Sequence, residues 1–462
     1  MHLITDPQDH FTAPKKNAVP IKLITASEFR SKGSQLDRET LAWAKTNGFS
    51  AKTGQSCLIP NSKGGVSAVL FGLGSGKGNN KAFAHAKLAR TLPKGSYTIE
   101  ANKADHELSQ LAWAMGGYSY DKYRKRQHQT PQLAAKVSAE VNRQVEAVFL
   151  TRDLINTPAN DMGPNALEAA FRKLARNHKA KVSVVKGEDL LSKNFPMVHA
   201  VGRASAEAPR VLDMTWGKAG HPKITLVGKG VTFDTGGLNI KPGSSMGLMK
   251  KDMGGAANVM GLAHMIMDRK LPVRLRLIVG AVENSISANA FRPSDVIQSR
   301  KGFSVEIGNT DAEGRLVLGD CLALGDEDKP EIMIDMATLT GAARVALGPD
   351  LPPLYSDDDR FSADVLASGF KLSDPLWRMP LWEPYQSMLS SRIADVSHIT
   401  AGGFAGSVTA ALFLSRFVSH AKTWAHLDVF GWVPSDKPWA TVGGEAQGIR
   451  ALYDVLQARY AK

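Results

Sequence analysis

Cysteine and long apolar runs are both scarce in this sequence. Its 462 residues include only two cysteines, Cys57 and Cys321. Two thiols are too few for a disulfide framework or a cysteine metal cage, and they are typical of a reducing compartment. No apolar run reaches the length of about 18 residues that a membrane span requires. The N-terminus carries Asp6 and Asp9 and lacks a basic segment followed by an apolar one, so we expect a cytoplasmic protein without a secretory signal or a membrane partner.

Charge is plentiful but uneven. The formal net charge is +13, and residues 1–150 hold 21 Lys and Arg against 11 Asp and Glu, so +10 lies in this third and +3 in the remainder. Such asymmetry is typical either of a nucleic-acid partner or of a solvated basic face. No aromatic-interleaved basic stripe or helix-turn-helix pattern accompanies it, so the solvated face is favoured and nucleic-acid binding is kept as the alternative.

The length of the chain predicts two or three domains. Residues 1–130 are expected to form a small N-terminal α/β domain, with a strand at 67–73 and a helix at 80–92. Helical periodicity over 131–156 begins at Pro131 and stops before Pro158, which predicts a long linking helix. The remaining residues, 157–462, would form the larger C-terminal domain.

Strand-like and helix-like segments alternate in that larger domain. Apolar runs rich in β-branched residues alternate with stretches of helical periodicity; the runs lie at 224–231, 274–282 and 332–339, and the helical stretches at 254–268 and 314–325. This alternation predicts an α/β fold with a parallel or mixed central sheet covered by helices on both faces. In such sheets ligands bind outside the carboxyl ends of the strands.

Three familiar catalytic motifs are absent or incomplete. The stretch "FGLGSGKG" has Phe71 and Gly78 where a phosphate-binding loop needs Gly and Ser or Thr. The stretch "GSSMG" at 243–247 follows Lys-Pro rather than a buried strand, so a loop is expected there and not a nucleophile elbow. No H-E-x-x-H occurs, and His426 lies in an apolar run where a core histidine is expected.

The stretch "NTDAEGRL" at 309–316 places Asp311, Glu313 and Arg315 within five positions. Taken alone, it is typical of a solvated turn at the start of a helix. About sixty residues upstream, charged side chains also interrupt a largely apolar segment, and they are Lys229, Asp234, Lys241 and Asp252. Buried charges are costly unless they pair with one another or bind a ligand, so internal salt bridges and a binding site both fit.

Four carboxylates and two lysines at predicted strand ends are compatible with a pair of divalent ions. Carboxylate oxygens are ligands of such ions, and shared carboxylates form the two-metal sites of phosphatases, nucleases and aminopeptidases. Spacing alone leaves phosphoryl transfer and peptide hydrolysis both open.

Five motifs together resemble one family. "VGKGVTFDTGG", "IKP", "MKKDMGGAA", "NTDAEGRL" and "IDMATLTGA" are similar to those of the leucyl aminopeptidase (cytosol aminopeptidase) family, peptidase family M17, over about residues 150–462. The resemblance implies a dinuclear metallo-exopeptidase that hydrolyses peptides with a free N-terminus and releases apolar first residues. It also implies a homo-oligomer, a hexamer in this family.

The resemblance assigns roles by position. Two Zn²⁺ or Mn²⁺ ions would be held by Lys229, Asp234, Asp252, Asp311 and Glu313, with Asp234 and Glu313 bridging; as a ligand, Lys229 must be a neutral amine with a lowered pKa. The catalytic residues would be Lys241, which stabilises the oxyanion, and Arg315, which holds a bicarbonate that shuttles protons. The pocket for the first side chain would be lined by Met249, Asn309, Thr338, Leu339, Gly341 and Phe430.

One position departs from the common family pattern. Phe430 stands where the family commonly has a small residue, so the size preference of the pocket is open. An inactive scaffold is a further alternative, but all seven metal and catalytic positions are present, which favours an enzyme.

Overall fold

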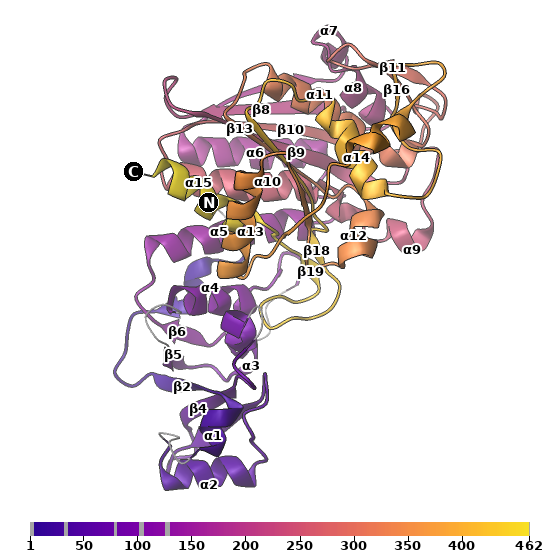
Figure 1. The fold of residues 1–462 in the computed structure, drawn as a ribbon. Coiled ribbons are helices and arrows are strands. Elements are labelled where there is room, and N and C mark those ends of the chain that lie inside the picture. Colours follow the sequence, from indigo (N-terminus) through magenta and orange to yellow (C-terminus); the bar gives the residue numbers. More distant parts are fainter. Residues whose placement is uncertain (1–3, 32–35, 78–80, 101–105, 125–129, 462) are drawn as a thin grey trace. The chain divides into compact units, whose positions relative to one another are not determined.

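The computed structural model describes residues 4–31, 36–77, 81–100, 106–124 and 130–461, and it divides into two compact units. The N-terminal unit comprises His2–Phe149 and Ser435–Val442. The C-terminal unit comprises Leu150–Pro434 and Gly443–Lys462. Figure 1 follows the chain from one end to the other.

The N-terminal unit is built on one six-stranded sheet. Its strands follow the order β1 (Phe11–Thr12), β6 (Gln132–Ala134), β5 (Ser96–Glu100), β2 (Val19–Ile24), β4 (Val66–Gly72) and β3 (Ser56–Pro60). All neighbours pair in parallel except β3 and β4. Its helices are η1 (Pro7–His10), α1 (Ala26–Arg30), α2 (Arg38–Thr46), η2 (Lys81–Lys87), α3 (Leu88–Thr91) and α4 (His106–Gly117). The predicted small α/β domain is confirmed; the helix predicted at 80–92 is a 3₁₀ turn followed by α3, and residue 80 lies outside the described residues.

The predicted helix over 131–156 begins later than expected. Gln132–Ala134 form β6, where the Gln132 N–H donates to Gly95 O, and the helix α5 is Ala139–Asn156. Ser138 precedes the helix and its Oγ accepts the N–H of Val141. The prediction was wrong for the first eight residues because pairing with β1 and β5 overrides local helical periodicity.

A short loop from late in the sequence belongs to the N-terminal unit. The Arg90 guanidinium donates to Lys437 O at 2.5 Å and to Pro438 O at 2.9 Å, and Trp439 packs edge-on against Phe83. These contacts attach 435–442 to this unit, whereas the sequence had assigned all of 157–462 to one domain.

The C-terminal unit contains a mixed eight-stranded sheet. Its strands follow the order β15 (Trp377–Arg378), β14 (Pro353–Tyr355), β17 (Thr423–Asp428), β13 (Ile332–Ala337), β9 (Lys223–Asp234), β10 (Arg274–Asn284), β8 (Arg210–Trp216) and β7 (Lys181–Lys186). The four central strands, β17, β13, β9 and β10, are parallel, and β8 and β14 flank them antiparallel. The predicted mixed sheet is therefore confirmed.

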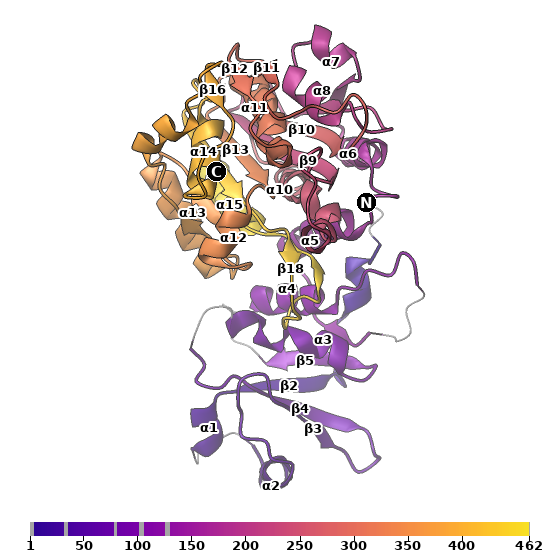
Figure 2. The ribbon, with the colours of Figure 1, turned by 90° about the vertical axis from the view of Figure 1, so that its right-hand side faces the viewer.

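Helices cover both faces of this sheet (Figures 1 and 2). Gly228 of β9 faces α10 (Gly254–Asp268), and Gly230 of β9 faces α6 (Pro164–His178). A Cβ at Gly228 would lie 2.6 Å from Ala256 Cα. On the opposite face, a Cβ at Gly280 of β10 would lie 2.3 Å from Val317 of α11 (Glu313–Asp326). Glycine thus permits the close approach of helix and sheet on both sides.

The remaining elements of this unit are short strands and further helices. They are α7 (Asp189–Ser192), α8 (Pro196–Gly202), α9 (Gly243–Met246), η3 (Met249–Met253), β11 (Val296–Gln298), β12 (Ser304–Glu306), η4 (Thr310–Ala312), α12 (Gly341–Leu347), α13 (Asp359–Lys371), η5 (Glu383–Leu389), β16 (Val396–Ser397), α14 (Gly406–Ser415), β18 (Trp432–Val433), β19 (Gly443–Gly444) and α15 (Ile449–Tyr460). The loop predicted at 243–247 contains the one-turn helix α9, whose N-cap residue is Pro242. In the described part of the chain, no helix has both the length and the apolarity needed to cross a membrane.

Candidate metal centre

Three buried carboxylates meet at the carboxyl ends of the central strands. Asp234 ends β9, Asp252 lies in η3 and Glu313 begins α11. One oxygen from each lies within 4.8 Å of the other two, and all three residues are at most 2% exposed. Three carboxylates this close repel one another, so the cluster requires compensating positive charge.

Lys229 supplies part of that charge. Its Nζ lies 2.7 Å from Asp252 Oδ2 and 3.0 Å from Glu313 Oε1, and it donates to Thr338 O. Burial alone would lower the pKa of Lys229, but Asp252 and Glu313 raise it above its ordinary value. The lowered pKa expected from the sequence applies to Lys229 as a metal ligand beside two dications, and it stays a prediction for that state.

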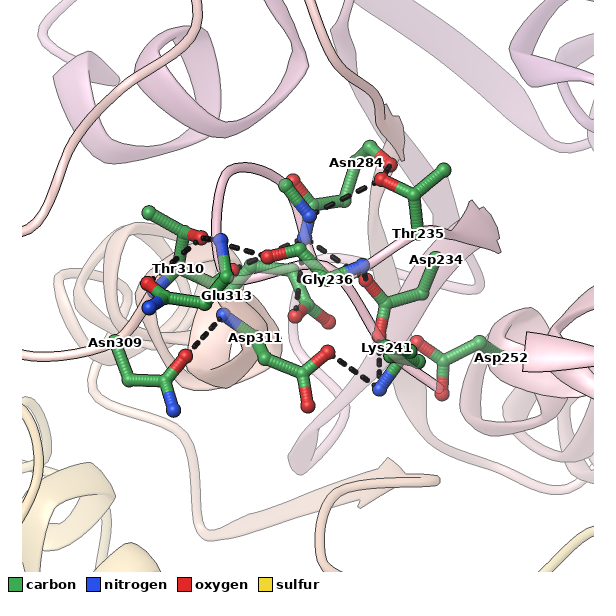
Figure 3. A network of polar contacts seen from close by, with 12 residues as sticks. Asp234, Thr235, Gly236, Lys241, Asp252, Asn284, Asn309, Thr310, Asp311 and Glu313 are labelled. Carbon is green, nitrogen blue, oxygen red and sulfur yellow. Dashed lines mark hydrogen bonds and ion pairs between the residues drawn. The ribbon is translucent and has the colours of Figure 1, made fainter. Parts of the chain in front are cut away.

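Lys241 supplies the second positive charge. Its Nζ lies 2.8 Å from Asp234 Oδ2 and 2.6 Å from Asp311 Oδ1, and Figure 3 shows both carboxylates turned toward it. The turn that brings Lys241 back over β9 requires Gly236, whose φ is +87° and where a Cβ would lie 2.7 Å from Asp311 Oδ1. Asp311 is thus linked to the cluster through Lys241.

Asn284 completes the network, and the sequence had not singled it out. It ends β10, is fully buried, and its Nδ2 donates to Asp234 Oδ1 at 2.8 Å and to Thr310 O at 3.0 Å (Figure 3). Its position at the end of an apolar strand could have indicated a site residue, since ligands bind at the carboxyl ends of the strands in such sheets.

The electrostatics of the cluster favour a bound cation. Burial raises the pKa of Glu313 to about 8, with Asp234 adding to the rise. Burial and the neighbouring Asp252 also raise the pKa of Asp234. For Asp252, burial is outweighed by Lys229 and Lys251, which lower its pKa. Because burial is the main cause of the raised pKa values of Glu313 and Asp234, these carboxyl groups are more stable in this site with a bound proton or a bound cation than as free carboxylates.

The donor set also fits a divalent ion chemically. Asp252 Oδ2 and Asp311 Oδ1 each lie beside a lysine, but neither makes an aligned hydrogen bond within the described residues. Buried carboxylate oxygens that have spare acceptor capacity are suitable ligands for hard or borderline ions.

Arg315 lies at the start of α11, two residues after Glu313. It is 8% exposed, and its Nη1 donates to His398 O at 2.7 Å while its Nε has no hydrogen-bond partner in the described chain. Burial lowers the pKa of Arg315 to about 10, which Asp428 and Glu313 partly oppose. A guanidinium at a helix N-terminus is suited to hold an anion.

The cluster opens into a cavity of about 420 Å³. Five of the six residues predicted for the pocket line it, namely Met249, Thr338, Leu339, Gly341 and Phe430. Asn309 does not line it; its Oδ1 accepts the N–H of Asp311 and so holds that residue in place. The cavity is also lined by Lys251 and Arg344, which the sequence had not indicated.

His426 is buried, as expected, but is not a simple core residue. Its Nδ1 lies 2.5 Å from Asp335 Oδ1, and Trp424 Nε1 donates to the other oxygen of Asp335. In the described chain, His426 Nε2 has no hydrogen-bond partner. The prediction of a buried histidine is confirmed, but its hydrogen-bonding capacity is only partly used.

An α/β sheet that gathers buried carboxylates and lysines at its strand ends, beside a cavity, defines the class of metal-dependent hydrolases. Comparison with known proteins makes this specific. Residues 149–453 match the catalytic domain of the cytosol aminopeptidase family, and residues 19–136 match the M17 aminopeptidase N-terminal domain. The chain belongs to the cytosol aminopeptidase family, M17, and is a metal-dependent aminopeptidase acting on peptides.

Individual relatives agree with this assignment. The chain is 40% identical over 376 residues to a probable cytosol aminopeptidase of Sinorhizobium medicae, covering 76% of this chain and 74% of the relative. It is similar to the crystal structure of a cytosol aminopeptidase from Coxiella burnetii, with a TM-score of 0.93, 42% identity, and coverage of 98% of this chain and 100% of the other. It is also similar to the bottromycin maturation enzyme BotP in complex with Mn, with a TM-score of 0.87, 30% identity, and coverage of 96% and 99%.

Proposed function

We propose that this aminopeptidase holds two divalent ions, Zn²⁺ or Mn²⁺, through the side chains of Lys229, Asp234, Asp252, Asp311 and Glu313, with Asp234 and Glu313 bridging. The observation that carries the proposal is the group of three buried carboxylates within 4.8 Å of one another. When bound, such ions supply Lewis-acid activation of the scissile carbonyl and of the attacking water.

The remaining charged groups have separate tasks in this proposal. Lys241 is 13% exposed at its side chain and faces the cavity, so its ammonium would stabilise negative charge that develops on the carbonyl oxygen. Arg315 would hold an anionic base, bicarbonate by family resemblance, because its buried guanidinium retains a free Nε donor.

The cavity would receive the first side chain of a peptide with a free N-terminus. By family resemblance the first residue would be apolar, and Met249, Leu339 and Phe430 give the cavity apolar lining, but Lys251 and Arg344 line it as well.

We also propose a homo-oligomer, a hexamer by resemblance, located in the cytoplasm. Support for assembly comes from large apolar side chains that stand exposed in the C-terminal unit, including Val345 at 86% and Phe404 at 84%. The division into domains at 1–130, 131–156 and 157–462 stays a prediction, and the loop 435–442 is its clearest exception.

Removal of metal tests the central proposal. A chelator should abolish hydrolysis of leucyl amides, and added Zn²⁺ or Mn²⁺ should restore it. Elemental analysis should find about two ions per chain, and fewer in Asp252→Asn, while the matched change at the exposed Asp364 should leave the metal content unaltered. N-acetylated peptides should be refused. Full activity after stripping, or equal cleavage of an acetylated peptide, would overturn the proposal.

A further inference from the structure

Two cationic side chains meet at one aromatic ring inside the cavity. Lys251 Nζ lies 5.0 Å from the centroid of the Phe430 ring, and the Arg344 guanidinium carbon lies 4.7 Å from the same centroid. All three residues line the cavity that also contains Asp252 and Lys241. The positive charges therefore lie in the part of the cavity assigned to the first side chain.

Neither cation has an acidic partner of its own. Throughout the described residues, no carboxylate comes within ion-pair distance of Lys251 or Arg344, whereas Lys229 and Lys241 each have two. Lys251 is only 4% exposed, so its ammonium has lost most of its water without gaining a counter-ion. The ring of Phe430 compensates in part through cation–π attraction, but it offers no acceptor to the three N–H groups.

The nearest acids are occupied elsewhere. Asp428 lines the same cavity, but its Oδ1 accepts from Leu339 N and Thr340 N, and its Oδ2 accepts from the hydroxyls of Thr340 and Ser407. Asp252 pairs with Lys229. The cavity thus presents two unneutralised cations to whatever enters it.

We propose that the first-residue pocket of this enzyme takes a side chain that ends in a carboxylate, so that N-terminal Glu or Asp is preferred over the isosteric Gln or Asn. The proposal rests on the proposed function, because it assigns the cavity to the first side chain of a peptide. An acidic side chain would give Lys251 and Arg344 the acceptors that they lack. A leucine side chain would leave the buried ammonium without one, so leucyl amides should be cleaved, but less efficiently than glutamyl amides.

The test compares amino-acyl amides of matched shape on the metal-loaded enzyme. The kcat/KM for the Glu amide should exceed that for the Gln amide by about tenfold or more, since a charge-assisted contact is roughly twice as strong as a neutral one. Lys251→Met and Arg344→Met should each reduce that ratio toward one. Lys218→Met removes an exposed lysine in the loop before β9 and should leave the ratio unchanged.

A charge-reversed variant at the exposed Arg344 keeps the test possible if the buried Lys251 cannot be replaced without unfolding. Arg344 is exposed on α12, so Arg344→Glu should fold even if Lys251→Met is unstable, and it should shift preference toward first residues with a positive side chain. Amides carry no C-terminal carboxylate, so a Glu advantage in this series belongs to the first side chain. Leucylglycine and leucylglycinamide, compared in parallel, report on an α-carboxylate instead.

The outcomes distinguish the acidic preference from the aminopeptidase activity itself. Cleavage of the leucyl amide with equal rates for Glu and Gln amides would overturn the acidic preference and leave the aminopeptidase proposal intact. An advantage of leucylglycine over its amide without a Glu advantage would also overturn it. Failure to cleave any amide in the presence of metal would instead count against the proposed function.

Discussion

Gly314 decides whether Lys229 can reach the carboxylate cluster. A Cβ at Gly314 would lie 2.4 Å from Lys229 Cε and 2.7 Å from its Nζ, closer than any real contact. Lys229 is 3% exposed, and its Nζ contacts Asp252, Glu313 and Thr338 O, so moving the side chain away from an alanine at 314 would break those contacts.

We expect Gly314→Ala to lower kcat/KM by about two orders of magnitude or more while the protein stays folded, because displacement of catalytic groups by about 1 Å costs that much. Gly325→Ala is the matched control, since it lies on the same helix and its Cβ would meet three side-chain ends, the Thr225 methyl at 3.0 Å, Met333 Cε at 3.2 Å and Ile278 Cδ1 at 3.5 Å. Assays of the leucyl amide and thermal melts of both variants check this. Equal activity in the two variants would contradict the argument.

Phe430 is the residue where this chain leaves the common family pattern. It lines the cavity and is only partly buried, which argues against a core position behind the sheet. We expect Phe430→Ala to shift kcat/KM toward bulkier first residues such as Phe over Ala or Leu, because discrimination by pocket size is worth about 1–3 kcal/mol. The measurement is a panel of amino-acyl amides together with a thermal melt. A loss of about 3–5 kcal/mol of stability with an unaltered panel would place the ring in the core instead.

At the scale of elements, His398 connects β16 to the segment that carries the site. It follows β16, and its ring accepts the N–H of Gly308 at Nδ1 and donates to Asn309 O from Nε2 at 2.9 Å. The contact from Gly308 requires the neutral ring, because a protonated Nδ1 cannot accept a hydrogen bond, whereas Nε2 can donate to Asn309 O from either form; Nδ1 also lies 3.1 Å from Glu306 O. Burial and the nearby Arg315 lower the pKa of His398 to about 3.

This depressed pKa predicts a specific loss of stability in acid. In the unfolded chain the histidine gains a proton near pH 6.5, whereas in the folded chain it resists protonation until about pH 3. The stabilising contribution is thus complete above pH 6.5 and is lost as pH falls toward 3, by up to about 1.4 kcal/mol per pH unit. We expect His398→Gln to melt lower than the parent at pH 8 and the difference to shrink between pH 6.5 and 4. Parallel melting curves across that range would contradict this.

At the scale of the whole molecule, the charge is concentrated in the first 150 residues, which carry +10 of the net +13. If this charge forms a solvated basic face, binding to duplex DNA should be weak and sequence-independent, and should disappear as salt rises from about 50 to 200 mM. Fluorescence titration with two unrelated duplexes at several salt concentrations checks this. Tight binding to one duplex that survives moderate salt would instead support the nucleic-acid alternative.

Much of the architecture was predictable because it depends on local periodicity. The runs at 224–231 and 274–282 lie within β9 and β10, and the stretch at 254–268 is α10, residue for residue. The motif at 309–316 was recognisable because Asp311, Glu313 and Arg315 are close in sequence and fall at the turn into α11. Where long-range pairing competes with periodicity, as in β6, the prediction was wrong, since a short apolar segment can form either a helix or a strand.

The sequence by itself determined the strand and helix alternation, the family motifs and the residues that carry charge into an apolar environment. Only the tertiary structure decided which side chains meet. Asn284 reaches Asp234 from fifty residues away because β9 and β10 are adjacent in the sheet, and Lys251 and Arg344 converge on Phe430 from three separate segments. These long-range contacts depend on strand order and helix packing. Both are determined by the whole chain, so no local stretch of sequence predicts the contacts.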